Sequence, residues 1–314
     1  MSSILIRRSN LLVSMAERGQ VENAWRHDAD AITLDLESGV PPELKPAARA
    51  QVREALQPAA RGGAEIFVRV NDSTMSEDLD ACVWPGLSGI MVPRVESAAD
   101  VAEAAEIVTV LERERRLPVG SVSLIAVIES AAGVWHLRSI VAASPRVSQV
   151  ALDEGDLAAS LGIEPLPEYD PFVYARGRVA VEATAARVGA IGMAYPLSVR
   201  PREAPGSEIH ALATKARNSG MKGVICPYAS WVAPVNAAFT PTSELVAWNR
   251  RVREAFAAGV AAGTAAVPLE GRMIDVPVDE WAIVVLATAE ACAARDAQKS
   301  AAKSQASETP SKSQ

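Results

Sequence analysis

The chain has 314 residues, of which 49% are hydrophobic and 22% are charged, and its formal net charge is -7. This length allows one large barrel or two ordinary domains, and the composition is that of a globular protein able to bury a core. The negative charge argues against a nucleic-acid partner, no apolar run approaches the ~20 residues of a membrane span, and the N-terminus lacks an apolar signal region. We therefore expect a cytoplasmic protein with no nucleic-acid and no membrane partner.

Cysteine and histidine are scarce, with three of each in the chain. The cysteines lie far apart in the sequence, which predicts neither a disulfide framework nor a cysteine-based zinc site. The histidines fall in expected helices rather than at strand ends, which argues against a histidine-centred triad or zinc site. Carboxylates, arginines and lysines remain as the carriers of chemistry.

Short apolar segments alternate with helical segments at a spacing of about 30 residues, which indicates parallel strands joined by helical crossovers. Eight such units in about 230 residues match the size of a (β/α)₈ TIM barrel. A doubly wound open sheet is the alternative, although the sequence has no Gly-rich dinucleotide motif. The expected strands are 9–14, 31–37, 65–71, 88–93, 122–129, 147–152, 190–195 and 223–226.

Helices are expected between these strands and after the last one. The segment 263–276 is expected to be a loop or a hairpin. We predict that residues 1–240 form the barrel, that 241–297 form a helical extension contributing to a neighbouring subunit, and that the Ser/Lys/Gln-rich tail 298–314 is disordered. The expected helices are 17–26, 45–57, 76–81, 98–115, 131–143, 172–188, 206–219, 243–262 and 278–297.

Two carboxylates stand at the ends of successive expected strands. Glu129 closes the strand 122–129, and Asp156 follows the strand 147–152. Barrels of this kind build their active sites at the carboxyl ends of the strands. The pair could chelate one Mg²⁺, which prefers oxygen ligands and keeps several waters for exchange with a substrate. The alternative is that both carboxylates only cap the helices that follow.

Motifs at or beside the expected strand ends extend from about residue 8 to residue 290. They are Arg8-Ser9 with 11–13, LDLE at 34–37, VRVN at 68–71, GIMVPRVES at 89–97, VIES at 127–130, DLAASLG at 156–162, VN at 235–236 with FTP at 239–241, and GRMID at 271–275. In this order the set resembles the HpcH/HpaI aldolase and citrate lyase β-subunit family, and more closely its citrate lyase/malyl-CoA lyase branch. The resemblance implies a (β/α)₈ barrel whose C-terminal helices are exchanged between subunits.

The resemblance also implies a metal and a reaction. It places a divalent ion, usually Mg²⁺, on Glu129 and Asp156, the same pair that the strand ends indicate. The implied reaction splits or forms a 3-hydroxyacyl-CoA, such as malyl-CoA or citramalyl-CoA, between C2 and C3 of the acyl chain. One fragment is a small carboxylic acid whose carbonyl the metal polarises, and the other passes through a thioester enolate.

Arg69 is the candidate for stabilising that enolate or a carboxylate. A guanidinium at a strand end offers a fixed fork of donors and keeps its charge. It could equally form a structural ion pair with Asp35 or Glu37 on the adjacent strand, and the two roles are compatible. The resemblance places Asp35 and Glu37 along the metal pocket, where they would hold the arginine or the metal's waters.

Further residues receive a role only from the resemblance. Asp275 would reach into the site of a neighbouring subunit and serve as acid/base, or it would simply cap the last helix. Lys45, Arg49 and Arg8 would contact the phosphates of CoA, whereas the alternative for the two helical residues is a solvated helix face. We expect a homo-oligomer, either a trimer or a hexamer.

The chain departs from the family pattern at several positions. Gly155 stands where the family has a glutamate, and either Asp153 or Glu154 could take over that function. Cys226 replaces a histidine, and Arg94 stands where lysine is usual.

A family stretch rich in aspartate is replaced here by 195–200, so the acyl group stays open. Three alternatives to the lyase also stay open: thioester hydrolysis at the same site, an aldolase acting on a free hydroxy- or oxo-acid, and a barrel that binds acyl-CoA without turnover. Free acetate as product would identify the first. Loss of metal binding with intact folding would favour the last.

Overall fold

A computed structural model describes residues 4–164, 166, 169–192 and 200–308. Residues 193–195 of the predicted seventh strand, most of the divergent stretch 195–200 and the end of the predicted tail, 309–314, lie outside these residues. The statements below concern the described part of the chain.

Eight parallel strands form one sheet in the order β7-β6-β5-β4-β3-β2-β1-β8. A bridge between Ile191 and Gly223 joins its two edges, so the barrel is nearly closed, and the predicted (β/α)₈ fold is confirmed. The strands are β1 (Ser9–Ser14), β2 (Ala31–Asp35), β3 (Glu65–Arg69), β4 (Gly89–Val92), β5 (Ser123–Ile128), β6 (Val147–Leu152), β7 (Gly189–Gly192) and β8 (Val224–Cys226).

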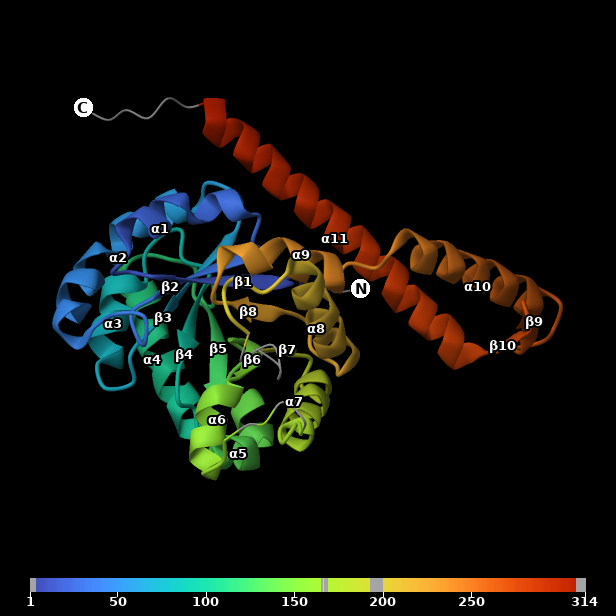
Figure 1. Cartoon of the computed structure of the whole chain (residues 1–314), viewed down its shortest axis with the longest axis horizontal. Helices are drawn as coiled ribbons and strands as arrows, with labels where there is room; N and C mark the ends of the chain where they lie inside the picture. The colour runs from blue at the N-terminus through green and yellow to red at the C-terminus, as the bar shows by residue number, and fades with distance from the viewer. Residues whose placement is uncertain (1–3, 165, 167–168, 193–199, 309–314) are drawn as a thin grey trace. The chain divides into compact units, whose positions relative to one another are not determined.

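The helices of the barrel surround these strands (Figure 1). Two of the α-helices, α6 and α9, have no counterpart among the predicted helices. Both are short, and α6 begins directly after β6, where the sequence indicates only a loop. The helices are α1 (Arg18–Asn23), η1 (Ala24–His27), η2 (Pro42–Leu44), α2 (Lys45–Ala60), α3 (Met75–Cys82), α4 (Ala98–Glu114), α5 (Ala131–Val141), α6 (Glu154–Leu161), α7 (Val173–Ala185), α8 (Gly206–Asn218), η4 (Ala229–Trp231) and α9 (Val232–Phe239).

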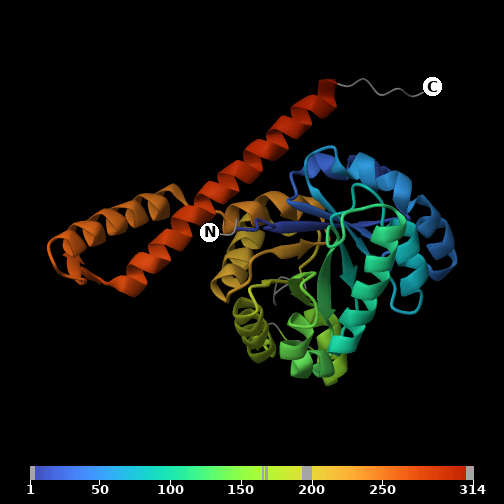
Figure 2. The ribbon, with the colours of Figure 1, turned by 180° about the vertical axis from the view of Figure 1, so that it is seen from behind.

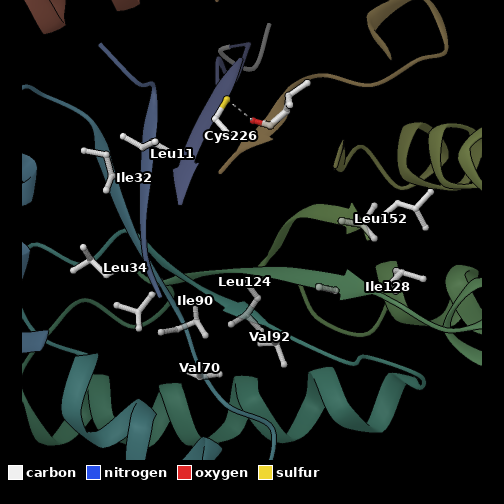
Figure 3. Packing of buried hydrophobic residues seen from close by; sticks show 14 of the residues in the cluster. Leu11, Ile32, Leu34, Val70, Ile90, Val92, Leu124, Ile128, Leu152 and Cys226 are labelled. Carbon is white, nitrogen blue, oxygen red and sulfur yellow. Dashed lines mark hydrogen bonds between the residues drawn. The ribbon is translucent and has the colours of Figure 1, made fainter. Parts of the chain in front are cut away.

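The strands bury side chains on both faces, since successive residues point to opposite sides of a strand. Outward-facing side chains such as Leu34, Ile90 and Leu152 pack in the layer between strands and helices (Figure 3). A second and smaller cluster comes from the alternate positions and fills the inside of the barrel. It consists of Ala31, Phe67, Met91, Ile125, Val127, Ala151 and Ile191.

The amino ends of the strands carry fully buried ion pairs. Arg8, just before β1, donates to both carboxylate oxygens of Asp30, just before β2, at 2.8 and 3.0 Å. Lys299 donates to the same carboxylate at 2.6 Å. Beside them, Arg7 pairs with Glu65 at 2.5 Å. These contacts fasten the end of the chain to the bottom of the barrel.

The chain divides into two compact units, residues 7–239 with 299–314 and residues 1–6 with 240–298. The second unit contains α10 (Ser243–Ala261), the antiparallel strands β9 (Val267–Leu269) and β10 (Arg272–Ile274), and the first part of α11 (Val276–Glu308). The hairpin lies at the end of α10 (Figure 2). The unit's small core includes Val252, Ile274 and Ala282.

The tail departs from the prediction. Helix α11 continues to Glu308, so the predicted disorder from residue 298 is wrong for the eleven residues 298–308. The physical reason is the pairing of Lys299 with Asp30, which the tail's polar composition does not reveal. No described helix combines the length and the apolar character that crossing a membrane requires.

Candidate active site

The inward-facing series of the strands ends in charged residues at the carboxyl end of the barrel. Asp35 follows Ala31 and Thr33 on the inner side of β2, and Arg69 follows Phe67 on β3. The same alternation carries Glu129 inward beyond β5 and Asp153 inward beyond β6. The sheet therefore directs these four side chains to the same opening.

Arg69 is held in place by an unusually complete set of partners. Its Nε and Nη2 donate to the two carboxylate oxygens of Asp35 at 2.7 and 2.8 Å, and Nη2 also donates to Ser38 Oγ at 2.5 Å. Glu37 lies 3.2 Å from Nη1. Burial alone would lower the pKa of Arg69, but its hydrogen bond with Asp35 and the nearby carboxylate charges outweigh it and raise the pKa. The predicted structural ion pair thus exists, and it orients the guanidinium.

Asp35 is positioned from behind by the turn that follows β2. Its carboxylate accepts hydrogen bonds from the backbone amides of Glu37 at 2.9 Å and Gly39 at 2.7 Å. A side chain at position 39 would meet Asp35 Oδ2 at 2.5 Å, so the turn requires glycine there. These bonds leave Asp35 as a support for Arg69 and not as a group free to react.

Glu129 and Asp156 experience an excess of negative charge. Only 7% of Glu129 is exposed. Burial, followed by the charges of Asp153, Glu37 and Asp156, raises the pKa of Glu129 to about 7. The pKa of Asp156 is also raised, by burial and by Asp153, although Arg94 and Arg69 oppose the shift. Asp153 thus disfavours the charge of both carboxylates, and Glu37 and Asp156 add to its effect on Glu129.

This cluster fits a divalent cation. Acids that repel one another and have no full set of cationic partners are stabilised when a metal ion neutralises them. Among the described residues no group of three or more His, Cys, Asp or Glu side chains is arranged to hold a metal. The predicted ligands Glu129 and Asp156 would supply two oxygen atoms, and water and substrate would take the remaining positions, as Mg²⁺ prefers.

The structure distinguishes the two acids beside Gly155. Glu154 is only 1% exposed and pairs with Arg176 at 2.8 Å, so it is engaged away from the cluster. Asp153 caps α6 by accepting from the amides of Gly155 and Asp156 at 2.9 and 3.2 Å, and its charge still acts on Glu129. Asp153 is the residue that can take over from the missing glutamate.

Cys226 cannot replace the family's histidine at the site. It shares the outward face of β8 with Val224, to whose carbonyl its thiol donates at 3.7 Å (Figure 3). The side chain is completely buried, and burial raises the pKa of the thiol far above its usual range. The Cys226 thiol is therefore an unreactive core group between the strand and the surrounding helices.

Lys45 and Arg49, on the first turns of α2, differ in how they are engaged. Lys45 donates to the amide oxygen of Asn71, a neutral group. Arg49 donates to Asp78 at 2.5 Å and to Thr74 at 2.8 Å, and the Asp78 carboxylate is buried. Both residues lie in the helix that follows the carboxyl end of β2. Their contact with CoA stays a prediction.

Arg8 lies apart from this cluster, and Asp275 belongs to the other compact unit. Arg8 is at the amino ends of the strands and is buried against Asp30, an arrangement that gives it a structural role and does not support the predicted CoA contact. Asp275 belongs to the second unit, where it caps α11 by accepting from the amide of Val278 at 3.3 Å. Its action in a neighbouring subunit stays a prediction.

Sequence reasoning left Asp153 as one of two alternatives and missed Ser38. Asp153 had a detectable signal, since it continues the inward alternation of β6 and precedes a glycine as an N-cap. Ser38 had none, because its role depends on where the turn after β2 places its hydroxyl relative to Arg69.

Comparison with known sequences identifies relatives over most of the chain. The sequence profile of the HpcH/HpaI aldolase/citrate lyase family matches residues 8–223. The citrate lyase subunit beta of Escherichia coli (strain K12) is 33% identical over 293 residues, 92% of this chain and 95% of the relative. The L-malyl-CoA/beta-methylmalyl-CoA lyase of Cereibacter sphaeroides is 32% identical over 288 residues, 83% of this chain and 88% of the relative.

Solved structures show the same architecture. The CitE protein of Mycobacterium tuberculosis, in complex with magnesium, acetoacetate and coenzyme A, matches with a TM-score of 0.71 and 25% identity, over 91% of this chain and 98% of that chain. A citrate lyase from Burkholderia xenovorans LB400 matches with a TM-score of 0.78 over 93% and 94% of the two chains. Its identity is 15%, so it supports the fold alone.

Proposed function

Because the chain belongs to the HpcH/HpaI aldolase/citrate lyase family, we propose that it is a Mg²⁺-dependent carbon–carbon lyase acting on a 3-hydroxyacyl-CoA such as malyl-CoA or citramalyl-CoA. The relatives named above are carbon–carbon lyases, which confirms the predicted enzyme class. The observation that carries the proposal is the pair of carboxylates Glu129 and Asp156, whose pKa values are both raised by burial and by Asp153, together with the guanidinium of Arg69 that Asp35 holds.

Glu129 and Asp156 would hold the Mg²⁺. The CitE relative, bound to magnesium, acetoacetate and coenzyme A, supports both the metal and a small acid beside a CoA group. When bound, the ion supplies Lewis-acid polarisation of the acid's carbonyl oxygen. Asp153 is close enough to act on both carboxylates, so it would orient water on the ion.

The reaction breaks the bond between C2 and C3 of the acyl chain. The hydroxyl on C3 gives up its proton and becomes the carbonyl of the released acid, while the electron pair of the broken bond passes to C2 and the thioester as an enolate. A proton then adds to C2. Arg69 is fixed by Asp35 and Glu37, so its remaining N–H can stabilise the enolate oxygen or a carboxylate without reorganising.

The remaining roles involve a neighbouring subunit and the helix α2. Asp275 of a neighbouring subunit would exchange the proton with substrate, which requires a homo-oligomer, a trimer or a hexamer. Lys45 and Arg49, on the first turns of α2, would pair with CoA phosphates. Arg8 has no part in this proposal.

Turnover of a small panel of thioesters tests the function. The purified full-length protein is incubated with 3-hydroxyacyl-CoA thioesters, including malyl-CoA and citramalyl-CoA, with Mg²⁺ or with EDTA, and the products are identified by mass spectrometry. A shortened acyl-CoA together with an oxo-acid, formed only with Mg²⁺, supports the lyase. Free CoA with the intact hydroxy-acid would indicate a thioesterase instead. Mg²⁺ binding without turnover of any thioester would contradict the proposal and favour a free acid as substrate.

A further inference from the structure

Asn71, two residues beyond Arg69, stands where the regular pairing of β2 with β3 ends. The register pairs Asp35 with Arg69, and the backbone amide of Leu36 donates to the carbonyl of Arg69 at 3.0 Å. In a parallel pair the next bond of this series would run from the backbone amide of Asn71 to the carbonyl of Leu36. That amide donates instead to Asp78 Oδ2 at 2.7 Å. The ladder therefore leaves the Leu36 carbonyl to a different donor.

The side chain of Asn71 replaces the missing backbone bond. Its Nδ2 donates to the carbonyl of Leu36 at 2.9 Å and to Asp78 Oδ2 at 2.7 Å. Its Oδ1 accepts from the ammonium group of Lys45. Because two acceptors surround the nitrogen and a donor faces the oxygen, the amide fits its surroundings in one orientation. Asn71 is only 3% exposed, so water does not compete for these bonds.

Asp78, on α3, holds the amide of Asn71 from the other side. Its buried carboxylate is paired with Arg49, whose Nε donates to Oδ1 at 2.5 Å. The hydroxyl of Thr74 lies 3.5 Å from Oδ2. A buried carboxylate that has both a cationic partner and further donors keeps a defined position. Asn71 is thus a rigid link between α3 and the turn after β2.

The carbonyl that Asn71 holds lies between the two acids that contact Arg69. Leu36 separates Asp35, which accepts two hydrogen bonds from the guanidinium, from Glu37, which lies 3.2 Å from Nη1. A shift of Leu36 would therefore move both carboxylates relative to Arg69.

We propose that Asn71 is a positioning residue, whose side-chain amide fixes the turn after β2 and thereby the guanidinium of Arg69. The proposal rests on the proposed function and adds to it a residue that acts through Asp35 and Glu37. A guanidinium stabilises developing charge without reorganising only when its own partners are fixed in advance. The link from α3 supplies that fixation from outside the acid cluster.

Asn71→Ala tests this assignment in the full-length protein, because it removes the donor to Leu36 and keeps the backbone. The kcat for the cleaved thioester should fall roughly tenfold to a hundredfold, since small misplacements of a catalytic group are costly. The KM for the thioester should stay within about threefold, because Lys45 keeps its charge. Asn71→Ser is the second variant if alanine prevents folding. Its single hydroxyl donor cannot bond both Leu36 and Asp78, so kcat should fall here too.

A second measurement does not depend on turnover. In protein labelled with ¹⁵N-arginine, the Nε–H signal of Arg69 is assigned by its loss in Arg69→Lys. This proton should exchange slowly with deuterium, because it is bonded to Asp35 at 2.7 Å and the arginine side chain is only 10% exposed. In Asn71→Ala the exchange should become at least about tenfold faster, since the turn that carries the acceptor is released.

Glu112 provides a matched control at the amino ends of the strands. Its buried carboxylate pairs with Arg146, just before β6, and accepts from the amide of Val122, just before β5. Glu112→Gln should lower the melting temperature at least as much as Asn71→Ala, because it leaves Arg146 without a counter-charge. It should leave both kcat and the exchange at Arg69 unchanged.

Three results would overturn the assignment. Unchanged kcat and unchanged exchange at Arg69 in Asn71→Ala would remove Asn71 from any positioning role. A raised KM with unchanged kcat would assign Asn71 only to the orientation of Lys45. An equal fall of kcat in Glu112→Gln would show that activity follows stability. If the unmodified protein cleaves no thioester, the proposed function fails, and the exchange at Arg69 still decides whether Asn71 fixes the guanidinium.

Discussion

The two ends of this barrel treat buried charge in opposite ways. At the amino ends of the strands, the carboxylate of Asp30 is completely buried and is shared by Arg8 and Lys299. At the carboxyl ends, burial and neighbouring acids outweigh the nearby arginines, and they raise the pKa values of Glu129 and Asp156. Burial would raise the pKa of Asp30, but its hydrogen bonds and ion pairs outweigh burial and lower the pKa. The pKa of Glu129 moves the other way.

The difference separates structural charge from functional charge. A paired buried carboxylate contributes to a defined fold, since removing either partner leaves the other uncompensated. A repelling cluster opposes folding of the metal-free chain and persists only where the site has a ligand to neutralise it. The comparison therefore predicts that equivalent substitutions at the two ends have opposite consequences.

The largest effect is expected for Glu129→Gln, which keeps the shape of the side chain and removes its charge. With one of two oxygen ligands weakened, Mg²⁺-dependent turnover should fall about a thousandfold, since metal polarisation contributes several kcal/mol to the barrier. The metal-free variant should melt at the same temperature as the unmodified protein or higher, because repulsion is removed. Thioester assays and thermal melts in EDTA check both parts. A variant that melts well below the unmodified protein would contradict the functional interpretation of this end.

Asp30→Asn tests the other end. Arg8 and Lys299 would stay buried without a counter-charge, so the free energy of unfolding should fall by about 3–5 kcal/mol. Turnover per folded molecule should be unchanged, since the pair lies away from the carboxyl-end cluster. Denaturant titration measures the loss. Glu22→Gln is the matched control, because it removes a carboxylate from the exposed pair with Arg18 and should leave stability unaltered.

The same contrast explains which features could be predicted from the sequence. The strands and the Glu129–Asp156 pair follow from local pattern, because alternation and strand ends are read within a few residues. The pairing of Arg69 with Asp35 was an open alternative, and it is realised because these residues are register partners on β3 and β2. The family resemblance added the metal and the reaction class.

Contacts between residues far apart in the sequence could not be predicted from local patterns. Asp30 follows Arg8 by 22 positions and precedes Lys299 by 269, so the local pattern reveals neither the buried role of Arg8 nor the ordered helix at 298–308. Helix α6 is too short for a periodic signal, and its start depends on the side chain of Asp153 bonding the backbone.

A smaller effect of opposite sign at the two ends is expected on changing pH. The pKa of Glu129 is raised from 4.5 to about 7 in the folded metal-free protein, so its contribution to stability is complete below 4.5 and is lost as pH rises through 7. The lowered pKa of Asp30 acts in reverse, since its contribution is present above 3.8 and is lost as pH falls.

The contribution of Glu129 is measured by comparing the melting temperatures of the unmodified protein and of Glu129→Gln in EDTA between pH 4.5 and 8. The difference should grow in favour of the variant as pH rises, and excess Mg²⁺ should reverse it above pH 7, where the unmodified carboxylate binds the ion without releasing a proton. A difference that does not change with pH would show that Glu129 is not repelled by its neighbours.

The smallest effect separates Lys45 from Arg49, which lie one turn apart on α2. Lys45 donates only to the neutral amide oxygen of Asn71, so its ammonium group is available to pair with a CoA phosphate. Lys45→Gln should therefore raise the KM for the thioester up to about tenfold at low salt and leave kcat unchanged. Arg49 neutralises the buried Asp78, so Arg49→Gln should lower the melting temperature as well. Arg61→Gln, exposed just after the same helix, controls for charge alone. If Lys45→Gln destabilises the protein without changing KM, Lys45 has a structural role, although it lies at the carboxyl end, and the functional charges of that end are limited to the acid cluster and its arginines.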